Sequence, residues 1–116
     1  MVRVRSHRNL IAWIPAAVWM AGMAWVSLLP GPPLTPGTDL WLHALAYGIL
    51  TVLLRFATAS RGTVQSALLA AGAAIAYGMF LEGVQAVLPY RTAEARDLLA
   101  NAIGVAAAVL IPIRRR

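Results

Sequence analysis

The chain has 116 residues, the length of one small domain. Hydrophobic residues make up 60% of it and charged residues 12%, whereas soluble domains carry about 45–50% and about 25%. Because its apolar runs also approach about 20 residues, this composition argues against a soluble globular domain and predicts that the solvent of the chain is a lipid bilayer.

The net charge of +6 would suggest a nucleic-acid partner if the arginines covered one folded face. Instead they cluster at both termini and beside the gaps between apolar runs, which is the pattern of membrane-topology charges. We therefore expect no nucleic-acid partner. The chain has no cysteine, which excludes thiol chemistry, and its two histidines, His7 and His43, argue against a metal cage. We expect no metal and no cofactor.

The first apolar run covers about residues 10–29 and is long enough to cross a hydrocarbon core of about 30 Å. It is followed at 30–37 by four prolines and two glycines, which break helices and predict a loop. The second run, about 40–58, begins after Thr38 and Asp39, whose side chains are suited to capping a helix.

Arg55 lies near the far end of the second run, from where its side chain can reach the membrane interface beside Arg61. Residues 60–62 then form a short turn. The third run, about 64–88, ends before Pro89, and the fourth covers about 97–113. Two pairs of small residues in the third run permit close helix contact in lipid: Gly72 with Ala76, and Ala74 with Gly78.

These runs predict an all-α integral membrane bundle of four transmembrane helices, multi-pass in the cell membrane. The membrane domain, residues 10–113, lies between a basic segment at 1–9 and a basic tail at 114–116. With both termini in the cytoplasm, eight arginines lie inside and only Arg91 and Arg96 lie outside. Because arginine is retained on the cytoplasmic side, we predict an N-in/C-in orientation.

In this orientation most other polar side chains lie in the outer half of the bilayer. They share one face on each of three predicted helices: Asp39, His43 and Tyr47 on the second, Glu82 and Gln85 on the third, and Asp97 and Asn101 on the fourth. A carboxylate such as Glu82 is costly in hydrocarbon, so a functional pocket between these helices is one interpretation, with Arg91, Arg96 or His43 as its partner. The other is a polar plug that only fixes helix register.

Together these residues resemble a known family. The pattern Asp39-x-x-x-His43-x-x-x-Tyr47, Glu82-x-x-Gln85, Arg91 with Asp97 six residues later, and Asn101-x-x-Gly104 is similar to the VanZ-like family over about residues 10–112. The family is named for a protein linked to teicoplanin resistance and consists mostly of four-helix membrane bundles. Two positions depart from its pattern: Leu40 follows Asp39 where many members have lysine, and Ala108 stands where relatives often have glycine.

The resemblance implies a role in the cell envelope. We expect the outward pocket to bind or modify an envelope component, such as a lipid-linked precursor or the lipid tail of a glycopeptide, and so to lower susceptibility to lipoglycopeptides such as teicoplanin. Candidate catalytic residues for proton transfer are Glu82, His43 and Asp97. Candidate ligand-binding residues are Arg91, Asp39, Tyr47, Gln85 and Asn101.

Two other functions stay open. A small proton-coupled exporter would need an intramembrane acid, and Glu82 could serve, although the first run contains no acid. A non-catalytic membrane scaffold or accessory subunit would tolerate amide replacement of Glu82 and Asp97. The sequence leaves open whether the protein is an enzyme and whether it forms an oligomer.

Overall fold

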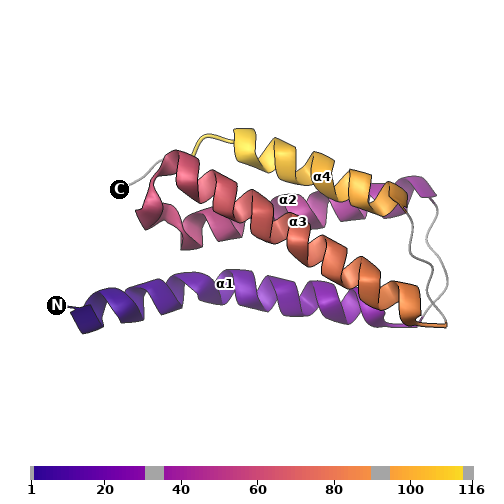
Figure 1. Ribbon diagram of the computed structural model, residues 1–116, viewed down its shortest axis with the longest axis horizontal. Helices are drawn as coiled ribbons and strands as arrows, with labels where there is room; N and C mark the ends of the chain where they lie inside the picture. The colour runs from indigo at the N-terminus through magenta and orange to yellow at the C-terminus, as the bar shows by residue number, and fades with distance from the viewer. Residues whose placement is uncertain (1, 31–35, 90–94, 114–116) are drawn as a thin grey trace.

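Four α-helices run side by side along the computed structural model (Figure 1). The structure describes residues 2–30, 36–89 and 95–113, and within these ranges it contains no strand. The helices are α1, Val2–Leu28; α2, Pro36–Ala57; α3, Thr63–Val87; and α4, Ala95–Leu110, with a short 3-10 turn, η1, at Ala59–Arg61 between α2 and α3. The all-α class predicted from the sequence is confirmed.

Three of these helices are long and apolar enough to cross a membrane. The candidate spans are Leu10–Leu28, Thr38–Ala57 and Thr63–Val87. The fourth helix, α4, has 16 residues, fewer than a usual span of about 20. The outer surface of the bundle is apolar, with large side chains such as Trp25 and Leu110 exposed to 70% and 82%. Such a surface is that of a protein surrounded by lipid.

The helix starts differ from the sequence prediction in two places. α1 begins at Val2, well before the apolar run, because the basic segment contains arginines, which are good helix formers. α2 begins at Pro36, whose fixed φ suits the first turn of a helix. Thr38 and Asp39 were predicted to cap this helix, and they lie inside its first turn instead.

The most extensive contact between helices joins α2 to α4, and glycine makes it possible. A Cβ added at Gly104 would collide with the backbone carbonyl of Ala44, with its carbon only 2.8 Å from the Ala44 carbonyl carbon. At Gly48 the added carbon would lie 3.3 Å from the Gly104 carbonyl oxygen. The two backbones therefore pack against each other with no side chain between them.

The small residues of α3 divide into a packed pair and an exposed pair. Ala74 and Gly78 are buried, and a Cβ at Gly78 would lie 2.9 Å from Asn101 Nδ2 and 3.1 Å from Tyr47 Cε1. Gly72 and Ala76 are exposed, and Gly72 has nothing within 4 Å of an added Cβ. Of the two predicted pairs, only Ala74 with Gly78 therefore provides helix contact within the bundle.

At the end opposite the starts of α2 and α4, a hydrogen-bonded turn joins α2 to α3. Thr58 Oγ1 and Ser66 Oγ are 2.7 Å apart, and Ser66 Oγ donates to the Arg55 carbonyl at 2.9 Å. Gly62 has φ +102°, a backbone conformation that side-chain-bearing residues rarely adopt. The turn predicted at residues 60–62 is confirmed.

The Arg55 side chain does not reach the interface beside Arg61, as the sequence suggested. It is buried, with 6% of the residue exposed, and its Nη1 donates to the carbonyls of Ala108 and Ile111 at 2.7 Å each. Carbonyls at a helix C-terminus have no partner within the helix, and a guanidinium satisfies them while it complements the negative end of the helix dipole. Arg55 therefore attaches the end of α4 to α2.

Candidate functional site

The first turns of α2 and α4 lie at the same end of the bundle, opposite the end where the figure marks both chain termini (Figure 1). Each first turn carries one acidic residue, Asp39 in α2 and Asp97 in α4. A carboxylate is favoured at this position because the amide hydrogens and the dipole of a helix N-terminus attract negative charge. The antiparallel course of the chain thus brings together two acids that are far apart in sequence.

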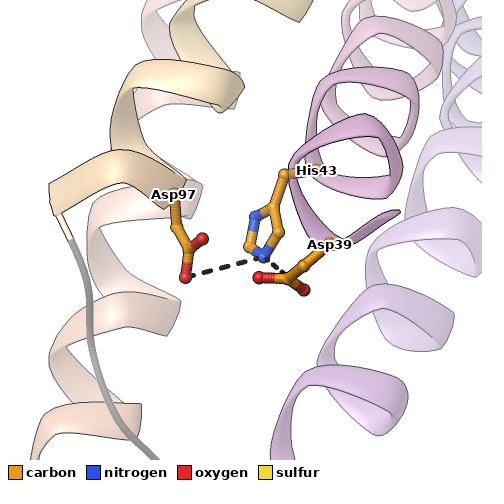
Figure 2. Close-up of side chains that lie close together, drawn as sticks. All are labelled: Asp39, His43 and Asp97. Atoms are coloured by element: carbon orange, nitrogen blue, oxygen red, sulfur yellow. Dashed lines mark ion pairs between the residues drawn. The ribbon is translucent and has the colours of Figure 1, made fainter. Parts of the chain in front are cut away.

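The imidazole of His43 lies between these two carboxylates (Figure 2). His43 Nε2 is 3.7 Å from Asp39 Oδ1, which lies one helical turn earlier, and 3.8 Å from Asp97 Oδ2 across the helix interface. The exposed fraction of the side chain falls from 38% at Asp39 to 18% at His43 and 8% at Asp97. The site is therefore open on the Asp39 side and closed on the Asp97 side.

The other imidazole nitrogen is held by Asn101. His43 Nδ1 is 2.9 Å from Asn101 Oδ1. A carbonyl oxygen only accepts, so this contact places the hydrogen of the imidazole on Nδ1. In the neutral ring, Nε2 then carries a lone pair that faces Asp39 and Asp97.

Tyr47 forms a wall of the site. Its ring stacks on the His43 imidazole, with centroids 6.3 Å apart and an angle of 7° between the planes. Tyr47 is 4% exposed and packs over Gly78, where a larger residue on α3 would push it away. It therefore helps to hold the orientation of the imidazole.

Two further predicted site residues, Gln85 and Glu82, are not among the groups that meet at the His43 imidazole. Gln85 donates from Nε2 to the Ser27 carbonyl at 2.8 Å, so its amide joins α3 to α1. Glu82 is buried on α3 and is not one of the acids grouped around His43. Arg91 lies outside the described residues.

The pairing of two acids on one imidazole is the feature that sequence reasoning missed. It assigned Asp39 to ligand binding and Asp97 to catalysis, whereas both carboxylates approach the same nitrogen of His43. One signal was available: both acids begin a helix, and each stands four residues before another polar site residue. Gly78, which admits Tyr47 and Asn101 beneath the site, was considered only as a packing residue.

A model of the VanZ/LLP1 family matches residues 3–115, nearly the whole chain. The chain belongs to the VanZ/LLP1 family. The resemblance inferred from the motif residues is thereby confirmed. No curated protein and no solved structure matches the chain.

The motif residues of this VanZ/LLP1 protein serve two purposes in the structure. Four of them form the arrangement that we call the His43 cluster: Asp39, His43, Asp97 and Asn101. Gly104, one turn beyond Asn101, is the point where α4 touches the α2 backbone. Close packing at Gly104 therefore sets the distance across which Asp97 and Asn101 reach His43.

Proposed function

We propose that the protein crosses the membrane four times, with both termini in the cytoplasm and the His43 cluster at the outer side. Two observations support this topology. Seven of the ten arginines lie in segments that it assigns to the cytoplasm, whereas Arg55 is buried within α2. The α2–α3 turn with Arg61 and the starts of α2 and α4 lie at opposite ends of the bundle (Figure 1).

Cysteine labelling tests this orientation cleanly because the native chain has no cysteine. Ala95 at the start of α4 and Ser60 in η1 are both exposed, so each can be replaced by cysteine without loss of packing. In intact cells we expect a membrane-impermeant maleimide to label Ala95→Cys, and to label Ser60→Cys only after permeabilisation. The reverse pattern would contradict the N-in/C-in orientation.

We propose that the His43 cluster binds or modifies a component of the cell envelope and thereby lowers susceptibility to lipoglycopeptides such as teicoplanin. The observation that carries this proposal is the cluster itself: two carboxylates, an imidazole and an amide from two helices meet at one end of a mostly apolar bundle. Polar groups in such surroundings are costly and mark functional sites by default. The partner is a lipid-linked precursor or the lipid tail of a glycopeptide.

His43 and Asp97 are the groups through which this site would act. Asn101 and Tyr47 fix the ring, and its Nε2 faces the side that is open through Asp39. An oriented imidazole can accept a proton from a bound hydroxyl or donate a hydrogen bond to a headgroup. Glu82 would add a second proton-transfer group from α3.

Drug susceptibility in a sensitive bacterium tests the function. The native protein is expected to raise resistance to teicoplanin but not to vancomycin, and Asp97→Asn and Glu82→Gln are each expected to abolish the protection at equal protein amounts. Asparagine and glutamine keep side-chain volume, so the comparison isolates the carboxylates. Unchanged protection in both variants would favour the non-catalytic scaffold, and drug efflux from vesicles would favour the exporter.

A further inference from the structure

We propose that Asp39, His43 and Asp97 bind one divalent transition-metal ion that takes imidazole as a ligand, such as Zn²⁺. Each residue offers one ligand atom, and the three atoms lie within 4.8 Å of one another. The sequence argued against a metal because it counted cysteines and histidines, but zinc also binds carboxylate oxygens alongside an imidazole nitrogen. Two of these donors are on α2 and one is on α4, so the ion would connect the two helices.

The distances between the three ligand atoms require a shift of the two aspartate side chains on binding. Tetrahedral zinc with bonds of about 2.0–2.1 Å separates neighbouring ligand atoms by about 3.4 Å. His43 Nε2 is 3.7 Å from Asp39 Oδ1 and 3.8 Å from Asp97 Oδ2. Each carboxylate oxygen therefore has about 0.3–0.4 Å to close toward His43 Nε2, and the two carboxylate oxygens, which lie within 4.8 Å of each other, have up to about 1.4 Å to close. Rotation of the two aspartate side chains about their own bonds supplies movements of this size.

Asn101 prepares His43 for this role. Its Oδ1 is 2.9 Å from His43 Nδ1, which leaves Nε2 as the metal-binding nitrogen. Histidines that bind metal almost always make such a hydrogen bond through the other ring nitrogen, because it fixes the tautomer and the direction of the lone pair. Asn101 is 2% exposed, so packing holds its amide in place and water does not compete for the hydrogen bond to His43.

The charge of the cluster also favours a divalent ion. Two carboxylates around a neutral imidazole carry two negative charges, and a single proton on the ring would balance only one of them. A divalent cation balances both, and the gain is larger at a partly buried site such as this one, because the effective dielectric constant is low. Side-chain exposure of 8% at Asp97 and 18% at His43 places two of the three ligands in such surroundings.

Three protein ligands leave a coordination position of zinc for another oxygen. The site is open on the Asp39 side, where the side chain is 38% exposed. An anionic oxygen of a lipid headgroup, which bare carboxylates would repel, could occupy that position. This last step rests on the proposed function, whereas binding of the metal itself does not.

Zinc binding is measured on the full chain, purified in detergent without a histidine tag, loaded with Zn²⁺ and passed into metal-free buffer. We expect about one zinc per chain by mass spectrometry. His43→Gln and Asp97→Asn should each lose it, whereas His7→Gln, which replaces the only other imidazole in the chain, should retain it because the proposed ligands are unchanged. A zinc content below about a tenth per chain in the native protein, or equal contents in His43→Gln and His7→Gln, would overturn the proposal.

Two further variants separate the metal site from both folding and function. Asn101→Leu should keep the ligands but weaken zinc affinity by about 10–100-fold, as loss of an outer hydrogen bond usually does. Glu82→Gln should keep zinc although it loses teicoplanin protection. Zinc bound without any drug phenotype would leave the metal site standing and refute the proposed function, whereas protection without zinc would refute the metal site alone.

Discussion

Replacement of Gly104 by valine is expected to force α2 and α4 apart and to destabilise the protein by at least the ~1–3 kcal/mol typical of an overpacked core. The first added carbon would collide with the Ala44 carbonyl, and a backbone group within a helix cannot rotate away as a side chain can. Thermal unfolding in detergent, followed by the fluorescence of the four tryptophans, measures the effect. The Gly104→Val variant should also lose zinc, because Asp97 would be drawn away from His43.

Gly72→Val is the matched control for this substitution. Gly72 also lies within a helix, but nothing stands within 4 Å of an added Cβ. Its replacement should change the stability by less than about 1 kcal/mol, since only helix propensity is altered. If Gly104→Val unfolds at the same temperature as Gly72→Val, the contact between α2 and α4 is not the close one that the structure contains.

Removal of the Arg55 guanidinium should have the second large effect. Arg55→Met keeps an unbranched apolar side chain but removes both hydrogen bonds to the Ala108 and Ile111 carbonyls. Hydrogen bonds from a charged donor contribute about 1.5–3 kcal/mol, and of the two carbonyls that of Ala108 would keep its bond from the Ile111 amide at 3.3 Å. We expect a loss of about 2–4 kcal/mol in the free energy of unfolding, measured by the same thermal experiment and by titration with denaturing detergent.

The control for this prediction is Arg61→Met, which removes an equal charge from the same end of the bundle. Arg61 is exposed in η1, and exposed substitutions usually change stability by less than about 0.5 kcal/mol. Arg55→Lys should recover part of the loss, because an ammonium can still donate to these carbonyls. Equal effects of Arg55→Met and Arg61→Met would show that the buried guanidinium does not hold α4.

The helices could be predicted from the sequence because their signals are local. Apolar runs interrupted by prolines and glycines placed all four, and the third came within one residue of Thr63–Val87. The spacing of four residues between Asp39, His43 and Tyr47 correctly put them on one face of α2. Both conclusions need only the geometry of a single helix.

Contacts between helices could not be predicted in the same way. A helix that is apolar on all sides does not show which face packs on its neighbours, so its rotation stays open. For this reason Gln85 was assigned to ligand binding, although its amide donates to Ser27. Arg55 was expected at the interface for the same reason, since its partners on α4 and just beyond it lie more than 50 residues along the chain.

The shortness of α4 has a consequence for the lipid around the protein. Its 16 residues span about 24 Å, which is about 6 Å less than the hydrocarbon core of a typical bilayer. Arg55 anchors the C-terminal end of α4. If the protein crosses the membrane four times, the mismatch between the length of α4 and the thickness of the hydrocarbon core therefore falls at the end of α4 that carries Asp97. The bilayer would thin there, and phospholipid headgroups would descend to the level of His43 without leaving their leaflet.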